Sequence, residues 1–358
     1  MSFPVMTDTD HTLVPVVSPG TAIEPKPSDV QQQFAVRGAG LIMLEATAVL
    51  PEARITPGCL GIWKDEHIDG LQRIATAMKK CGAVAGIQLG HSGRLGSSIP
   101  LNRYTEGDSF KSGTSSGGWP DRVFGPSPVA FSSQFWTPKE LNERQINEIQ
   151  QAFVSAAVRA DKAGFDVIDI HAAYGMLLNQ FLSPTSNKRT DKYGGSFENR
   201  IRMLVEVADR VRQVWPQGKP IFVSLSILEG VDGGWTLDNT IRLAQLLSTK
   251  GVDMSELSMG GNSPDAKIPG GPAFKKEMAS RVKQNLSNFL VASVGVASNG
   301  EHANRVLEDG CADAMFSGRQ YLRNPSFALS AADELGVNVQ WIDQYQCARP
   351  NLKYDTFF

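Results

Sequence analysis

The chain has 358 residues, of which 41% are hydrophobic, and a formal net charge of −2 at neutral pH. This length allows one or two domains, and a charge so close to zero gives no electrostatic reason to expect binding to nucleic acid or to an anionic membrane. The apolar runs are too short to span a bilayer, and residues 1–10 lack the apolar core of a secretory signal, so we expect a cytoplasmic protein. The four cysteines lie far apart, which predicts reduced thiols and no metal site.

Short apolar runs alternate with segments of helical periodicity along most of the chain. They predict strands at residues 13–17, 41–45, 84–88, 167–170, 221–225, 254–257, 289–292 and 314–316. Helices are predicted at residues 29–37, 65–80, 139–163, 196–215, 237–247, 273–283, 301–308 and 325–335. Eight strand–helix alternations are the pattern of an α/β fold of the (β/α)8 TIM-barrel type, with residues 1–358 as a single domain. The alternative is a doubly wound open sheet. The lack of a G-x-G-x-x-G motif before the first helix argues against this alternative.

A long loop is predicted after the third strand, over residues 95–138, which are rich in Gly, Ser and Pro. Structureless loops of this length are uncommon unless they are functional, so we expect an excursion over the mouth of the barrel. Its aromatic side chains, Trp119 with Phe131 and Trp136, are candidates to cover an apolar carbonyl substrate. The alternative is that these rings only pack the loop onto the barrel.

The fourth predicted strand carries the main candidates for chemistry, because His171 and Tyr174 follow its apolar run. Active sites of (β/α)8 barrels lie at the carboxyl ends of the strands, and imidazole titrates near neutral pH. We therefore predict that His171 is a catalytic acid–base residue and that Tyr174 assists it. The alternative is a histidine that only packs in the core at the end of a strand.

Glycines follow the seventh and eighth predicted strands, at Gly295 and Gly318, and Arg319 comes next in the chain. Loops at these two places in (β/α)8 barrels often bind phosphate through backbone N–H groups, and an arginine adds a charged fork. The pair predicts a phosphate site, although each glycine taken alone is equally consistent with an ordinary turn.

Several longer motifs resemble the old yellow enzyme family of flavin-dependent oxidoreductases, and most closely its xenobiotic-reductase-like subgroup. The resemblance runs from residue 13 to the C-terminus. The motifs are Ser186-Asn-Lys-Arg-Thr-Asp-Lys-Tyr-Gly-Gly-Ser-Phe-Glu-Asn-Arg200, Asn179-Gln-Phe-Leu-Ser183, Glu45-Ala-Thr-Ala-Val49, Gln88-Leu-Gly-His91-Ser-Gly-Arg94 and Gly318-Arg-Gln-Tyr-Leu-Arg-Asn-Pro325. This resemblance implies a barrel that holds FMN at its mouth and reduces activated C=C bonds with NAD(P)H.

The resemblance also implies roles for individual residues. His171 and Tyr174 stand where the family grips the carbonyl oxygen of the substrate, and Ser18 stands where the subgroup has a redox-tuning Cys or Thr. Arg349 matches an arginine that reaches into the site of a partner subunit, which implies a homodimer. The residues implied to contact FMN are Pro15, Val17, Ala46, Gln88 and Ser224, with Gly295, Gly318 and Arg319 at its phosphate.

The sequence departs from the family pattern at the residues that carry the redox chemistry. Met176 occupies the position of the proton-donating tyrosine, and a thioether has no proton to give. Ser224 replaces an arginine beside flavin N1, and Tyr174 replaces the second substrate-gripping residue. Pro19-Gly20 replaces a polar pair in a shortened N-terminal segment. Met176, Ser18, Trp119 and Arg349 are accordingly the expected substrate contacts.

Three functions follow from these departures. The first is a redox-neutral proton transfer on an enolisable or α,β-unsaturated carbonyl compound by an epimerase or double-bond isomerase, with His171 as acid–base and a role in natural-product biosynthesis. The second is an FMN-dependent NAD(P)H ene-reductase or dehydrogenase, in which NAD(P)H is used only if FMN is bound. The third is a non-catalytic binding module. Fold alone does not choose among them.

Overall fold

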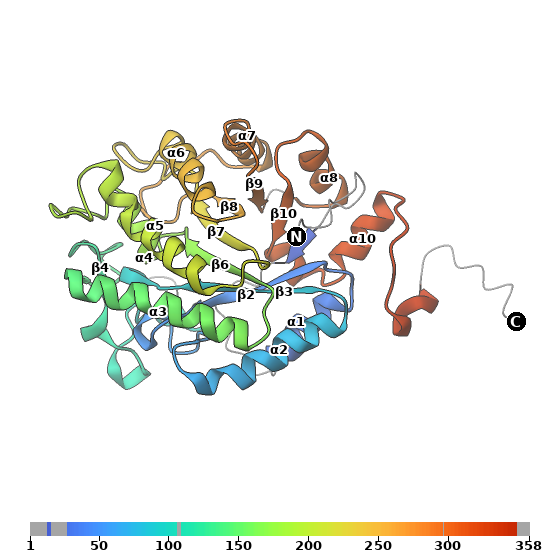
Figure 1. The fold of residues 1–358 in the computed structure, drawn as a ribbon, viewed down its shortest axis with the longest axis horizontal. Helices are drawn as coiled ribbons and strands as arrows, with labels where there is room; N and C mark the ends of the chain where they lie inside the picture. The colour runs from blue at the N-terminus through green and yellow to red at the C-terminus, as the bar shows by residue number, and fades with distance from the viewer. Residues whose placement is uncertain (1–12, 16–26, 106–108, 296, 349–358) are drawn as a thin grey trace, which may run out of the picture.

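A computed structural model describes residues 13–15, 27–105, 109–295 and 297–348 (Figure 1). Eight strands form one parallel sheet in the order β1-β10-β9-β8-β7-β6-β3-β2, and the strands at its two ends, β1 and β2, contact each other. Their bounds are β1 (Leu13–Pro15), β2 (Leu41–Ala48), β3 (Val84–Gly90), β6 (Val167–Ala172), β7 (Ile221–Ser226), β8 (Met254–Ser258), β9 (Leu290–Val294) and β10 (Ala314–Ser317). The curled parallel sheet is consistent with the predicted (β/α)8 barrel.

Helices between the strands cover the outer face of the sheet (Figure 1). The longer ones are α1 (Pro27–Ala35), α2 (Ile68–Lys80), α3 (Glu143–Lys162), α5 (Phe197–Val214), α6 (Leu237–Ser248), α7 (Pro272–Lys283), α8 (Gly300–Glu308) and α10 (Phe327–Glu334). Each overlaps a predicted helix. Two short helices were not predicted, α4 (Leu177–Leu182) and α9 (Arg319–Arg323). In the described part of the chain, no helix has both the length and the apolar character needed to cross a bilayer.

The predicted helix over residues 139–163 was wrong in its first turn. Two of its residues form strand β5 (Lys139–Glu140), which pairs with β4 (Phe124–Gly125) outside the main sheet. Helix α3 begins only after Asn142, whose side chain accepts a hydrogen bond from the backbone N of Gln145 at 3.0 Å. This capping box satisfies N–H groups that have no partner within the helix, and it therefore fixes where the helix starts.

The remaining loops contain short turns of 3-10 helix. They are η1 (Pro51–Ala53), η2 (Asp65–His67), η3 (Gly93–Leu95), η4 (Leu101–Arg103), η5 (Thr114–Ser116), η6 (Pro120–Arg122) and η7 (Asp343–Ala348). The predicted excursion over residues 95–138 contains η4, η5, η6 and strand β4. The excursion is therefore more ordered than the composition of its sequence suggests.

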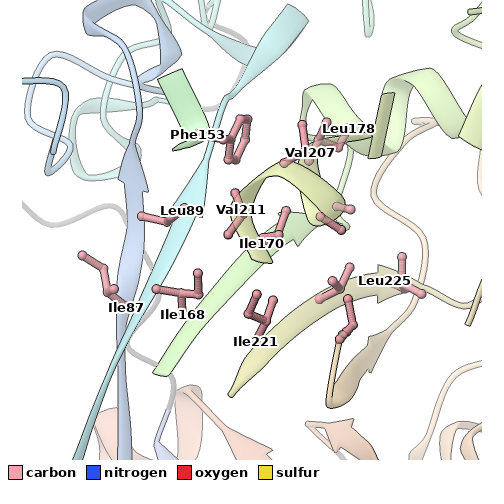
Figure 2. Close-up of a cluster of buried hydrophobic side chains, with 14 of the residues drawn as sticks. Ile87, Leu89, Phe153, Ile168, Ile170, Leu178, Val207, Val211, Ile221 and Leu225 are labelled. Atoms are coloured by element: carbon pink, nitrogen blue, oxygen red, sulfur yellow. The ribbon is translucent and has the colours of Figure 1, made fainter. Parts of the chain in front are cut away.

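Alternate side chains of each strand point outward into the main core, which lies between the sheet and the helices. Figure 2 shows Ile168 and Ile170 of β6 beside Phe153 of α3 and Val211 of α5, and all four side chains are fully buried. The period of two in β6 leaves Val167, Asp169 and His171 for the opposite, inward side. Packing of the apolar outer face thus determines which residues face the barrel interior.

Replacing Val211 with alanine should lower the free energy of unfolding by about 2 kcal/mol, from the burial of two methyl groups and the cavity left behind. The matched control is Val214→Ala on the same helix, where 39% of the residue is exposed. Both changes replace valine with alanine in the same helix, so urea denaturation of the two variants should separate the effect of packing. Equal losses in the two variants would contradict this account of the core.

The inward side chains form layers along the barrel. The lowest layer is an apolar cluster that includes Val167, Phe222, Met254 and Phe316 from four strands. Above it, the same faces carry polar side chains, since residues two positions further along a strand face the same way. In β8, for example, Met254 is followed on this face by Glu256 and Ser258. The interior therefore changes from apolar to polar toward the carboxyl ends of the strands.

Candidate active site

A pocket of about 630 Å³ lies at the carboxyl ends of the strands, which is where the sequence placed the site. Its volume is in the range of small-molecule and cofactor sites. The lining side chains come from β3, β6, β8, β9 and β10 and from the segments that follow them. Seven predicted site residues line it: Gln88, His171, Tyr174, Met176, Gly295, Gly318 and Arg319.

His171 is the penultimate residue of β6, and 6% of its surface is exposed. Its Nδ1 atom is buried without a hydrogen-bond partner in the described structure. Burial lowers the pKa of His171 from 6.5 to about 4, so the ring is neutral at physiological pH. A neutral imidazole has one N–H donor and one acceptor nitrogen, which suits it to bind a carbonyl oxygen or to transfer a proton.

The pKa of His171 predicts a pH dependence of stability. The unfolded chain binds a proton below pH 6.5 but the folded chain does not until about pH 4, so stability present above pH 6.5 is lost as the pH falls toward 4. His171→Asn should make this decline shallower by up to about 1.4 kcal/mol per pH unit. Urea denaturation of both proteins across the interval measures the slopes. Parallel curves would show that His171 is not buried in neutral form.

Tyr174 and Met176 approach the pocket from the segment after β6. Tyr174 has a left-handed backbone (φ 52°), and its N–H donates to Ser226 Oγ at 3.0 Å. Although 42% of the residue is exposed, burial and then the charge of Glu256 raise the pKa of Tyr174 to about 12. The phenol therefore keeps its proton across the physiological range. Met176 precedes α4 and is 7% exposed.

A network of hydrogen bonds ties together the loops that carry these residues. The guanidinium of Arg94 donates to the backbone carbonyl and the side chain of Asn262, which follows β8. Asn262 Nδ2 in turn donates to the buried carboxylate of Glu229 at 3.0 Å. After β6, Gly175 (φ 73°) packs so closely that a Cβ atom there would lie 2.4 Å from the carbonyl oxygen of Gly261. These contacts hold Tyr174 at a fixed place on the rim.

Ser224 lies under the pocket in β7, among acidic side chains. Its hydroxyl lies 3.0 Å from Glu256 Oε2, accepts from Gln88 Nε2 at 3.1 Å and also bonds to Asp169 Oδ2. Gln88 Nε2 donates to Asp169 Oδ2 as well, at 2.7 Å. In the described part of the chain, no lysine or arginine is hydrogen-bonded to these carboxyl groups. The floor of the pocket is therefore acidic.

The opposite side of the pocket, at β9 and β10, is basic. Lys275 of α7, Arg319 and Arg323 line it together with Gly295 and Gly318. Burial, and then the nearby charge of Arg319, lower the pKa of Lys275. Gly295 has φ 68°, and a Cβ atom there would lie 3.5 Å from Lys275 Nζ. Lys275 and Arg319 lie near each other, beside a glycine with a left-handed backbone, and together they form a site suited to a phosphate group.

Other predicted residues lie elsewhere or outside the described residues. Ala46 of β2 is not among the residues that line the pocket, and neither is Trp119. The Trp119 ring packs under the guanidinium of Arg54, whose Cζ is 4.5 Å from the ring centroid, so its substrate contact stays a prediction. Pro15 is the last residue of β1 and pairs in register with Ser317. Val17, Ser18 and Arg349 fall outside the described residues.

Sequence reasoning missed Glu256, Asp169 and Lys275 as members of the site. A signal for the first two was present, because each is a carboxylate in the middle of a predicted buried strand. Their proximity to each other depends on the register between strands that are far apart in the sequence. Lys275 carried no comparable signal, since lysines are common in exposed helices.

Comparisons with known proteins agree with this architecture. The sequence model of the NADH:flavin oxidoreductase / NADH oxidase family matches residues 11–338. The chain belongs to this family. It is 41% identical over 322 residues to an NADH:flavin oxidoreductase of Gibberella zeae, covering 86% of this chain and 77% of that protein. It is 39% identical over 312 residues to the NADPH dehydrogenase of Bacillus subtilis strain 168, covering 87% of this chain and 85% of the relative.

Solved structures support membership of the NADH:flavin oxidoreductase family. A mutant of morphinone reductase, in complex with tetrahydroNAD, matches 93% of this chain and 89% of its own, with a TM-score of 0.69 and 27% identity. A 2-naphthoyl-CoA reductase complex matches 91% of this chain with a TM-score of 0.79 at 22% identity, and this chain spans 50% of its length. The second likeness shows the fold alone.

Members of this family typically use FMN and NAD(P)H, and the pocket can be tested for its fit to FMN. The basic side at β9 and β10 fits the phosphate by charge, and the cavity volume suits a mononucleotide. Gln88 and His171 reach the same cavity from the other side. The lining residues therefore fit FMN, with the difference that the floor carries Glu256 and Asp169 bridged by a serine.

Proposed function

We propose that the protein is an FMN-dependent oxidoreductase that uses NAD(P)H to reduce a C=C bond conjugated to a carbonyl group. The family membership and the relatives at about 40% identity support this proposal. The observation that carries it is a single pocket with Lys275 and Arg319 on one side and neutral His171 on the other. Such a pocket can hold an anionic cofactor and an uncharged carbonyl compound side by side.

FMN, when bound, supplies the acceptor and donor of hydride. The protein's own residues orient the substrate and supply the proton. We propose that the N–H of His171 holds the carbonyl oxygen, which polarises the double bond. Tyr174, which retains its proton at neutral pH, is the proton source of this proposal, because Met176 at the neighbouring position cannot act as an acid. Of these three residues, Tyr174 and Met176 depart from the pattern of the xenobiotic-reductase-like subgroup, whereas His171 follows it.

A second candidate is the redox-neutral transfer of a proton on an enolisable or conjugated carbonyl compound. The observation that favours it is the acidic floor, because carboxyl groups beside the pocket oppose the negative charge of a reduced flavin. In this alternative His171 removes a proton next to the carbonyl group and a second group returns one. Natural-product biosynthesis is the setting that we propose for either reaction.

An absorption spectrum of the purified protein, followed by mass analysis of any released chromophore, separates the two functions. The reductase should be yellow, release FMN and oxidise NADPH in the presence of cyclohex-2-enone. A colourless protein that exchanges the α-protons of a carbonyl compound with deuterium oxide would support the redox-neutral alternative and overturn the reductase. A protein with neither activity would point to a non-catalytic binding module.

We also propose that the protein works as a homodimer in which Arg349 enters the site of the partner subunit. This rests on the matching position of Arg349 after Gln344 and Tyr345. Light scattering at micromolar concentration should give twice the mass of 38.8 kDa. A monomer under these conditions would refute it.

A further inference from the structure

On the acidic floor of the pocket, one serine hydroxyl lies between two carboxyl groups, and this constrains the protonation state of the two acids. Ser224 Oγ lies within hydrogen-bonding distance of Asp169 Oδ2 and of Glu256 Oε2, and it accepts from Gln88 Nε2. All four side chains are at most 7% exposed. Gln88, Asp169, Ser224 and Glu256 therefore form one hydrogen-bonded cluster inside the barrel, in which Asp169 Oδ1 has no partner in the described structure.

If both contacts of the Ser224 hydroxyl are hydrogen bonds, a count of the donors requires that one of the two carboxyl groups is protonated. A serine hydroxyl has a single proton, and an ionised carboxylate only accepts hydrogen bonds. If Ser224 donates to Asp169, its contact with Glu256 Oε2 is a hydrogen bond only when Glu256 is the donor. If Ser224 donates to Glu256, then Asp169 must carry the proton instead. One proton is thus shared along the chain Glu256–Ser224–Asp169, and the serine can relay it in either direction.

The surroundings favour the form with the proton on Glu256. Burial, and then the charge of Asp169, raise the pKa of Glu256 to about 8, and burial raises the pKa of Asp169 to about 6. Hydrogen bonds from Ser224 and Gln88 oppose the shift at Asp169. Two charged carboxylates this close in a site of low dielectric would repel each other strongly.

Three cations line the same pocket, but none of them is hydrogen-bonded to the cluster in the described structure. Lys275 of α7 and, after β10, Arg319 and Arg323 are among its lining residues. Tyr174 and His171 are the other titratable groups that face the pocket from β6 and the segment after it. Both of these are uncharged at neutral pH, as their pKa values of about 12 and about 4 require.

Only the Glu256 end of the hydrogen-bonded series Glu256–Ser224–Asp169 reaches the pocket. Glu256 is a lining residue, whereas Asp169 and Ser224 are not. His171 pairs in register with Ser224, and Ser224 pairs in register with Glu256, so His171 and Glu256 stand two strands apart. This separation is roughly 10 Å between backbones, since neighbouring strands lie about 4.8 Å apart. A small ligand between them can touch both side chains.

We propose that Glu256 is a second catalytic acid–base residue of this pocket and that Ser224 and Asp169 are positioning residues that share its proton. The proposal deepens the proposed function, on which it rests for the ligand. In the step, the O–H bond of the Glu256 carboxyl breaks, and a C–H or O–H bond forms on the enolate of the carbonyl ligand, which loses its negative charge. No electrons leave the protein, the cluster gains one negative charge, and water restores the proton after the product has left.

Infrared spectroscopy tests the shared proton without any need for activity. The purified protein should show at pH 7 the C=O stretch of a protonated, buried carboxylic acid that is lost in Glu256→Gln and kept in Glu45→Gln. Asp169→Asn removes the neighbouring negative charge, so the pH at which this band disappears should fall. Glu45→Gln is the matched control, because burial raises the pKa of Glu45 to about 7 without a contact to the cluster. Identical spectra for the wild type and Glu256→Gln would overturn the proposal.

Kinetics tests the catalytic role. With NADPH and cyclohex-2-enone, or with α-proton exchange into deuterium oxide if the protein is colourless, Glu256→Gln should lower kcat by about 10²-fold while KM changes little. Ser224→Ala should shift the pH profile of kcat toward that of an isolated glutamic acid. An unchanged kcat in Glu256→Gln overturns the catalytic role. A colourless protein that still loses exchange activity in Glu256→Gln supports it even though the reductase function has failed.

Discussion

Replacing His171 with alanine should lower kcat/KM by about 10²–10⁴-fold, measured with NADPH and cyclohex-2-enone or by α-proton exchange. The ring is buried at the end of β6, its Nδ1 atom has no partner in the described structure, and it lines the pocket. A polar atom in this state costs free energy in the folded protein unless a ligand satisfies it. The loss should fall on kcat as well as on KM, because the hydrogen bond strengthens as charge develops on the carbonyl oxygen.

His67→Ala is the control for this experiment, because His67 lies in η2, where its ring contacts Trp63 at 4.5 Å between centroids. It is not among the residues that line the pocket. The control should retain the turnover of the wild type. Full activity in His171→Ala would remove the central residue of both catalytic functions, because the reductase and the redox-neutral enzyme depend on the same imidazole.

Arg319→Glu should raise the dissociation constant for FMN by about 10–150-fold or more, which corresponds to the roughly 1.5–3 kcal/mol of a hydrogen bond to a charged group. The substitution removes one of the cations that line the basic side of the pocket and puts a negative charge beside a phosphate. Quenching of flavin fluorescence during titration of the flavin-free protein measures the constant. The yellow colour of the purified variant should fade in proportion.

Arg281→Glu serves as the matched charge reversal, since Arg281 is an exposed residue of α7, the helix that also carries Lys275. It changes the net charge of the protein by the same amount without touching the pocket. Equal FMN affinity in the two variants would mean that the basic side of the pocket does not hold the phosphate. Unaltered affinity in Arg319→Glu would also weaken the assignment of Gly295 and Gly318 as neighbours of the phosphate.

The positions of the strands could be predicted from the sequence because each is a short apolar run bounded by breaking residues. The run from Val167 to Ile170 illustrates this, since its outward side chains pack against α3 and α5. Element boundaries were less predictable. Residues 139–140 have enough helical character to extend α3, but pairing with residues 124–125 and the cap at Asn142 place them in a strand. Such tertiary contacts are not visible in local sequence periodicity.

The candidate site could be predicted only in part. Strand ends and turn glycines are local signals, and they led to His171, Gly295, Gly318 and Arg319, all of which line one pocket. The surroundings of Ser224 are a different case. In the sequence, Ser224 stands out only because it replaces an arginine of the family pattern. In the structure, its hydroxyl contacts two acids that lie 55 residues before it and 32 residues after it. That neighbourhood is set by the register of three strands, which no local pattern encodes.

The apolar layer below the carboxyl groups has a consequence for hydration. Phe222, Met254 and Phe316 close the barrel interior beneath Asp169 and Glu256, so solvent reaches Glu256 from the mouth. A ligand bound at the mouth then also blocks the access of solvent to this acid. Return of a proton from solvent to Glu256 therefore has to follow departure of the product.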